Sequence, residues 1–259
     1  MKSKENNTII IQLLIALLII VVEGATDIFT PSLPAIKKYF DSTEKIIQWT
    51  VSINLIGISI SSLFYGPLSD AVGRRKVILF GGFIFLVGSI CCGFAQNVFS
   101  LIFFRFIQGI GGGVAIVVGF ASIRDLFTGA VCSRVLSRIE MVVAISPGIA
   151  PVAGSYIARY LNWHFTFYFI SILAFVTLLV NYYFFYETIG EKKKTFSFPS
   201  LMLGYFVLLK NPGFWCFLLI QTLIFTRVFA ETANLPFVYV SMWDGKTPSP
   251  LGEHFSTIG

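Results

Sequence analysis

Two acidic residues and one basic residue lie inside apolar segments, where ionised groups are rare. Glu23 and Asp27 interrupt an apolar run near the N-terminus, and Arg105 interrupts a later one. A charge at the centre of a bilayer costs about 2.5–3.5 kcal/mol on insertion scales, so each needs a reason to be there. Glu23 and Asp27 are four residues apart and share one helical face, where two carboxylates can bind and release a proton. The alternative is that both are hydrated near the outer end of the helix.

Arg105 opens the string RFIQGIGGG. An arginine inside a span is not expected to face lipid and needs a carboxylate or carbonyl partner. We expect Asp27 or Glu23 to be that partner, directly or through water. Gly109 and Gly113 form a small-xxx-small pair that lets another helix come close, and packing alone accounts for these glycines.

The string GPLSDAVGRRK, residues 66–76, separates two apolar runs. Gly66 and Gly73 allow a tight reversal of the backbone. Asp70 is a suitable acceptor for the free N–H groups at the start of the next helix. The three cations that end the string mark one side of a bilayer. Spacing alone predicts a short cytoplasmic hairpin between two membrane helices.

Two further apolar runs carry residues of interest. Pro147 and Pro151 remove two helical donors and bend their span, and Gly154 lets a neighbouring helix approach. Arg227 and Glu231 are again four residues apart in the last apolar run. We expect the opposite charges of these two side chains to neutralise each other.

Long apolar helices must position these residues. The chain is 56% hydrophobic and only 12% charged, and its apolar residues come in blocks too long for a soluble core helix. The sequence therefore predicts a polytopic, all-α integral membrane protein. The seven predicted spans are 8–29, 46–65, 77–95, 98–122, 135–158, 165–186 and 214–240.

Several functional classes are not indicated. The net charge of +6 comes from cations placed between the spans, which is not the pattern of a nucleic-acid-binding face. The four cysteines lack metal-ligand spacing, so we expect neither a metal site nor a cofactor. The sequence has no Walker phosphate loop, no Gly-x-Ser-x-Gly and no His-Glu-x-x-His. Nothing predicts an enzyme, and ion gradients remain as the energy source.

The distribution of cations predicts the orientation. With the N-terminus in the cytoplasm, twelve Lys and Arg residues fall in inside segments and five in outside segments. We expect a six-helix bundle at 1–190, a basic cytoplasmic linker at 191–212, a seventh transmembrane helix at 213–242 and an extracytoplasmic polar tail at 243–259. Because an odd span count is an awkward stopping place, we expect a truncated chain.

These strings resemble motifs of the major facilitator superfamily. The string at 66–76 is similar to its loop between helices 2 and 3, although Ala71 stands where a cation is usual. The string that begins at Arg105 resembles the helix 4 motif, whose arginine is linked to proton coupling. The string SPGIAPVAG at 146–154 resembles the helix 5 motif of exporters, but Ser155 replaces a common glycine.

Two strings point to one branch of that family. Asp27, followed by Pro31 and Pro34, resembles the end of helix 1 in drug:proton antiporters. The string NLPFVY at 234–239 resembles helix 7 of the bicyclomycin/chloramphenicol-resistance (Bcr/CflA) branch. The resemblance implies a six-helix N-terminal bundle plus one helix, and proton-coupled multidrug efflux by alternating access at the cell (inner) membrane.

The resemblance also implies roles and partners. The implied groups are proton and substrate coupling (Asp27, Glu23, Arg105, Gln108), a cytoplasmic gate (Gly66, Asp70, Gly73, Arg74, Arg75, Asp125) and helix packing (Gly109, Gly113, Pro147, Pro151, Gly154). Asp125 would pair with Arg74 or Arg75, and Asp70 would face a helix of the second half. Implied partners are the lipid bilayer, protons, a small amphipathic or cationic substrate, and either a separately encoded second half or a second copy. The alternatives are a non-transporting fragment and a metabolite exporter of the same fold.

Overall fold

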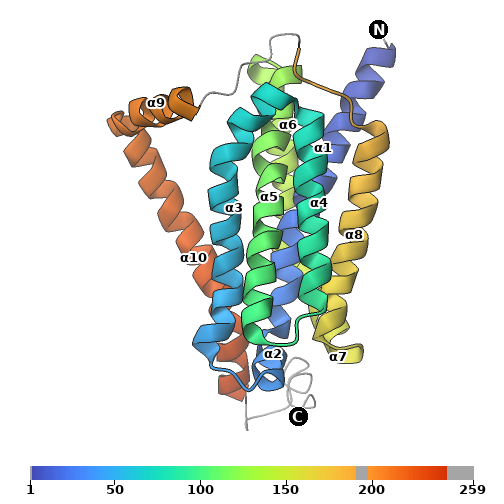
Figure 1. Cartoon of the computed structure of the whole chain (residues 1–259), viewed down its shortest axis with the longest axis vertical. Helices are drawn as coiled ribbons and strands as arrows, with labels where there is room; N and C mark the ends of the chain where they lie inside the picture. The colour runs from blue at the N-terminus through green and yellow to red at the C-terminus, as the bar shows by residue number, and fades with distance from the viewer. Residues whose placement is uncertain (1, 191–197, 244–259) are drawn as a thin grey trace.

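A computed structural model shows an all-helical protein whose long helices run side by side (Figure 1). It describes residues 2–190 and 198–243, without the side chains at 2–8, 198, 200, 201, 228, 229, 231–233 and 235–243. The elements are α1 (Lys2–Phe29), η1 (Thr30–Ser32), α2 (Leu33–Tyr39), α3 (Glu44–Val72), α4 (Arg74–Gly93), α5 (Val98–Leu126), α6 (Gly129–Val143), α7 (Ser146–Tyr160), α8 (Trp163–Phe184), α9 (Phe198–Leu209) and α10 (Pro212–Trp243).

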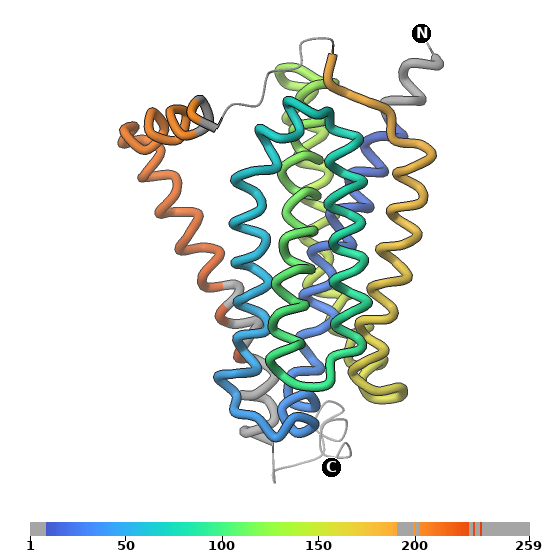
Figure 2. The backbone as a smooth tube through the Cα atoms, viewed as in Figure 1, coloured from blue at the N-terminus to red at the C-terminus, as the bar shows by residue number. Residues whose placement is uncertain are grey.

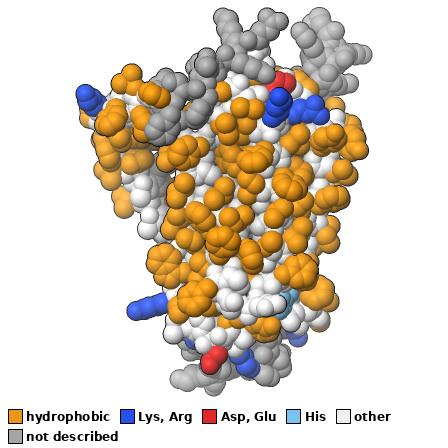
Figure 3. Space-filling model, in the orientation of Figure 1, with side chains coloured by type: hydrophobic (Ala, Val, Ile, Leu, Met, Phe, Trp, Pro, Cys, Tyr) orange, Lys and Arg blue, Asp and Glu red, His pale blue; other side chains and the backbone are white. Residues whose placement is uncertain are grey.

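Within the described part of the chain, six segments are long and apolar enough to cross a membrane, which confirms the first six predicted spans. The first continues from α1 through η1 into α2, and the fifth combines α6 with α7. On the face shown in Figure 3, hydrophobic side chains cover the middle of the molecule, while charged side chains gather toward its two ends. A bilayer imposes this distribution, because only the ends of the spans reach water.

The seventh predicted span lies within α10, which follows a sharp bend in the chain. Over the described residues, Met202–Leu209 of α9 and Pro212–Arg227 of α10 are together long and apolar enough to cross a membrane, and they meet at an angle of 88°. The bend falls where Pro212 begins α10, since proline cannot continue the preceding helix. Figure 1 shows α9 lying across the direction of the spans and α10 running obliquely beside α3.

Helix α5 lies between α3 and α4, as the backbone trace in Figure 2 shows. Its glycines face both neighbours at positions where a side chain would not fit. A Cβ atom at Gly109 would collide with the carbonyl of Asn54 on α3, and one at Gly111 would collide with the backbone of Phe85 on α4. Gly113 also faces α3, so the predicted pair of Gly109 and Gly113 lies on one packing surface.

The turn after α3 differs from the predicted hairpin. Helix α3 continues through Gly66 to Val72, so Gly66 belongs to the helix and takes no part in the reversal. The chain turns at Gly73, whose φ of 113° lies in a region that side chains rarely tolerate. The expectation of a reversal that begins at Gly66 is therefore wrong, because one glycine suffices to change direction between two long helices.

Candidate functional site

Arg105 on α5 lies in the interior of the bundle, and none of its surface is exposed. Its Nη1 donates to Oε1 of Gln108 at 2.7 Å, and its Nε donates to the carbonyl oxygen of Thr50 on α3 at 3.1 Å. The guanidinium carbon lies 4.7 Å from the ring centroid of Phe29 on α1. Gln108 in turn donates to the hydroxyl of Ser89 on α4 at 2.7 Å. Neutral dipoles and one aromatic face hold this cation, and its Nη2 has no hydrogen-bond partner.

The carboxylate partner expected for Arg105 is not in direct contact with it. Among the ion pairs of the described residues, none joins Arg105 to Asp27 or Glu23. The geometry of α1 gives the reason: Asp27 and Phe29 are two residues apart, which is a rotation of about 200° around the helix. When the Phe29 ring faces Arg105, the Asp27 carboxylate faces away from it. The prediction of a direct ion pair is wrong.

Asp27 instead points toward α7. The hydroxyl of Ser146 donates to its Oδ2 at 3.1 Å, and Asp27 is only 9% exposed. Glu23, one turn earlier and partly buried, lies within electrostatic range of both Asp27 and Glu140 of α6. The two α1 carboxylates therefore share a helical face, as their spacing predicts. That face is turned toward the fifth span and away from Arg105.

A break in the fifth span positions Ser146. The helix is interrupted between Val143 and Ser146, and Pro147 lies in the first turn of α7 with Pro151 inside it. A Cβ atom at Gly154 would collide with the backbone of Ile28 on α1. The close approach predicted from Gly154 is present, and with the interruption just before Pro147 it brings Ser146 to Asp27.

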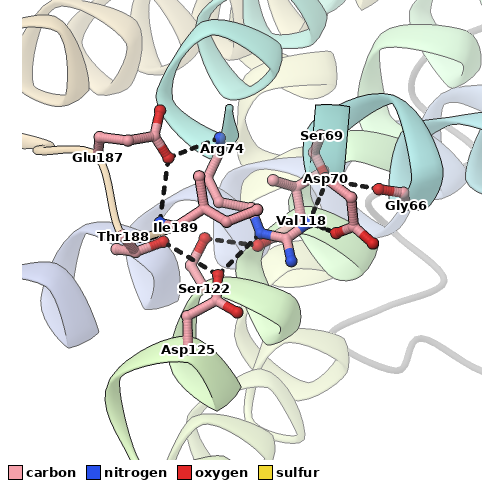
Figure 4. Close-up of polar contacts among 10 residues, drawn as sticks. All are labelled: Gly66, Ser69, Asp70, Arg74, Val118, Ser122, Asp125, Glu187, Thr188 and Ile189. Carbon is pink, nitrogen blue, oxygen red and sulfur yellow. Dashed lines mark hydrogen bonds and ion pairs between the residues drawn. The ribbon is translucent and has the colours of Figure 1, made fainter. Parts of the chain in front are cut away.

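A second polar cluster surrounds Arg74 at the end of the bundle where α3 meets α4 (Figure 4). The Nη1 of Arg74 lies 2.6 Å from Oδ1 of Asp70, and its Nε lies 2.9 Å from Oδ2 of Asp125 at the end of α5. Nη1 also donates to the hydroxyl of Ser69. The expected ion pair between Asp125 and Arg74 is therefore present, and it closes the end of α3 and α4 against α5.

The segment that follows α8 completes this cluster. The carboxylate of Glu187 accepts the backbone N–H of Arg74 at 2.8 Å and that of Ile189 at 3.2 Å. The hydroxyl of Thr188 donates to Asp125 at 3.4 Å (Figure 4). Glu187 thus caps the N-terminus of α4, where an anion is favoured. The prediction that Asp70 would accept this N–H is wrong, because Asp70 lies within α3 and binds the Arg74 side chain instead.

The sequence did not reveal every member of these sites. Glu187 follows the sixth span and lies 113 residues from Arg74 in the sequence, so no local pattern predicts their contact. The one available signal was a carboxylate at the same membrane edge as the start of α4. Arg75 forms no ion pair with Asp70 or Asp125. Its Nη2 donates instead to the carbonyl oxygen of Tyr182 at 2.6 Å. Arg227 and Glu231 lie on α10, and the side chain of Glu231 is outside the described residues.

Comparison with known proteins decides the family. A sequence profile described as Major Facilitator Superfamily matches residues 15–250. The chain belongs to the major facilitator superfamily. It is 31% identical over 236 residues to an uncharacterized transporter of this superfamily, YdgK of Bacillus subtilis, a match that covers 90% of the chain and 58% of YdgK. The major facilitator superfamily is a family of membrane transporters and not of enzymes.

One further relative and one solved structure of the superfamily are also similar to the chain. A bicyclomycin resistance protein homolog of Haemophilus influenzae is 26% identical over 93% of the chain and 61% of its own length. The solved structure of the proton:xylose symporter XylE superposes with a TM-score of 0.63 at 19% identity, over 70% of the chain and 45% of XylE. This likeness confirms the predicted all-helical fold. The chain spans about half the length of the relatives that it matches.

Proposed function

We propose that this chain forms the first half, and the start of the second half, of a proton-coupled exporter of small amphipathic or cationic compounds. In this proposal it belongs to the bicyclomycin/chloramphenicol-resistance branch and works by alternating access between two six-helix bundles. Residues 1–190 form the first bundle, 191–212 the cytoplasmic linker, and 213–242 the first helix of the second bundle. The N-terminus lies in the cytoplasm and the tail, 243–259, outside.

The observation that carries the proposal is the buried carboxylate of Asp27. It receives a hydrogen bond from Ser146 and has no cationic partner among the ion pairs of the described residues. A buried carboxylate without a counter-charge is costly, and either a proton or a cationic substrate removes that cost. Competition between these two occupants is the exchange that an antiporter needs.

Relatives and the second polar cluster support the same proposal. The match to a bicyclomycin resistance protein homolog favours export of a drug-like compound. At the proposed cytoplasmic end, the ion pairs of Arg74 hold α3, α4 and α5 together, and its backbone N–H binds Glu187 of the segment after α8. We assign this cluster the role of a gate, which must separate when the cytoplasmic side opens.

Transport requires a second six-helix bundle. We propose two sources for it, a separately encoded second half and a second copy of this chain. A resistance and dye-efflux assay of the chain alone, beside the chain co-expressed with each of these, identifies the active assembly. In that assembly, Asp27→Asn should abolish proton-linked efflux, since the amide cannot bind and release the proton.

The matched control is Asn54→Asp, which adds a carboxylate on α3 without restoring one on α1. Combined with Asp27→Asn, it should leave efflux absent, because the acid must lie beside Ser146. Efflux that continues unchanged in the Asp27→Asn variant would remove Asp27 from the mechanism and with it this proposal.

A further inference from the structure

Pro67 lies inside α3 and leaves one carbonyl of that helix without its usual donor. In an α-helix, each N–H bonds the carbonyl oxygen four residues earlier, and proline has no N–H. The acceptor that Pro67 fails to serve is the carbonyl oxygen of Leu63. Both residues lie in a segment long and apolar enough to cross a membrane, where lipid supplies no donor. This carbonyl therefore needs a donor from another part of the chain.

Tyr205 of α9 supplies that donor. Its hydroxyl donates to the carbonyl oxygen of Leu63 at 2.7 Å, across 142 residues of sequence. Within 202–209, Met202 and Tyr205 are partly buried and the other residues are exposed. Because residues three apart share a helical face, this is the face with which α9 packs on the rest of the chain. The polar contact of that face is made at the carbonyl that Pro67 leaves free.

Side chains also fasten the joint between α9 and α10. The indole N–H of Trp215 donates to the carbonyl oxygen of Leu209, in the last turn of α9, at 2.7 Å. The side-chain oxygen of Asn211 accepts the backbone N–H of Gly213, in the first turn of α10, at 2.9 Å. Both bonds serve backbone groups that a helix end leaves unpaired. The two helices thus form a bonded elbow, and the position of α9 fixes where α10 begins.

The elbow is attached to α3 close to the Arg74 cluster. Leu63 lies about two turns before Asp70, whose carboxylate pairs with Arg74. One stretch of α3 therefore carries the proline, the acceptor for Tyr205 and a member of the ion-pair cluster. A single hydrogen bond between neutral groups contributes little net stability, so it can break and form again when helices move.

We propose that Pro67 and Tyr205 form a latch, in which the proline frees a carbonyl on α3 and the tyrosine hydroxyl binds it and docks α9. While the latch is closed, the elbow holds the start of α10 beside this end of α3, and breaking the hydrogen bond releases both helices. The latch does not depend on the proposed export function, because it is made within this chain. The competing explanation is an apolar contact of the Tyr205 ring, which needs neither the hydroxyl nor the proline.

The test is hydrogen exchange of the full chain in lipid nanodiscs, read by mass spectrometry of peptides that cover 202–209. Tyr205→Phe removes only the hydroxyl and should speed exchange of these amides about fivefold, the effect of one hydrogen bond lost from the docked state. Tyr183→Phe is the matched control, since it removes a hydroxyl from an exposed tyrosine of α8, and it should leave this exchange unchanged. Peptides from the centre of α5 should exchange equally in every variant, which shows that the bundle is intact.

Pro67→Ala tests the origin of the free carbonyl. Alanine restores the N–H that bonds Leu63 within α3, so the carbonyl no longer depends on Tyr205. When Pro67→Ala is present, adding Tyr205→Phe should change the exchange of 202–209 by less than about twofold. This non-additivity is expected only if the two residues serve the same acceptor.

Three results would overturn the inference. Unchanged exchange in Tyr205→Phe would assign the contact to the ring alone. An equal effect of Tyr205→Phe with and without Pro67→Ala would show that the hydroxyl does not replace the missing N–H. An increase in Tyr183→Phe as large as that in Tyr205→Phe would show that the loss of any exposed tyrosine hydroxyl loosens α9.

Discussion

Two buried arginines in this protein are held in opposite ways. Arg74, at the end of the bundle where α3 meets α4, has carboxylates within 2.9 Å on two sides, from Asp70 and Asp125. Arg105, in the interior, has a carbonyl, an amide and an aromatic ring around it, and its Nη2 has no partner. The positive charge of Arg74 is thus compensated by two carboxylates, whereas the positive charge of Arg105 is surrounded by neutral groups.

This difference indicates different tasks. A buried ion pair with further hydrogen bonds resists separation, because removal of one member leaves the other charge uncompensated. Such a site suits a contact that must hold until a conformational change breaks it. A buried charge without a counter-charge costs stability, and proteins retain such features where function requires them. We therefore expect substitutions at Arg74 to act mainly on stability and substitutions at Arg105 mainly on transport.

The largest loss of stability is expected for Arg74→Met. Methionine keeps the length of the side chain but leaves Asp70 and Asp125 without their counter-charge, so the free energy of unfolding should fall by about 3 kcal/mol. Denaturant unfolding of the purified chain in detergent measures this change. Arg75→Met is the matched control, since Arg75 contacts the carbonyl and the ring of Tyr182 and is in no ion pair of the described residues. An equal loss in the two variants would contradict the comparison.

A smaller stability change is expected for Arg105→Met. The substitution removes an uncompensated buried charge together with its neutral hydrogen bonds, so the two effects should cancel to within about 1 kcal/mol. In the assembled transporter the same variant should lose proton-linked efflux, whereas Arg105→Lys keeps the charge and should keep part of the activity. A loss of stability as large as that of Arg74→Met would show that Arg105 is also a structural residue.

A small loss of stability, of the same order as the change for Arg105→Met, is expected for Glu187→Gln. The amide oxygen can still accept the N–H of Arg74, but the negative charge at the N-terminus of α4 is lost, which costs about 0.5–1 kcal/mol. Glu187→Ala should cost more than Glu187→Gln, because the backbone N–H groups of Arg74 and Ile189 also lose their acceptor. Unfolding of the three proteins under one set of conditions gives this order. Identical stabilities would mean that Glu187 does not cap α4.

The comparison also separates what local patterns can predict from what they cannot. Apolar runs of sufficient length predicted the six spans, and the spacing of Glu23 and Asp27 predicted that they share a face. An ion pair of Asp125 with Arg74 or Arg75 was implied by the resemblance to the major facilitator superfamily, and the structure has this pair at Arg74. The direct contact of Arg105 with an α1 carboxylate was predicted wrongly, since the pattern does not say which face of α1 turns toward α5.

Length, hydropathy and the positions of glycine and proline by themselves determined that this chain is a helical membrane protein with a break in its fifth span. They suffice because a bilayer requires long apolar helices and because glycine and proline act on the backbone locally. Only the tertiary structure decided that Asp27 meets Ser146, that Glu187 caps α4 and that α9 and α10 meet at 88°. These contacts depend on how each helix is rotated about its own axis and on which helices become neighbours, and packing across the whole bundle sets both.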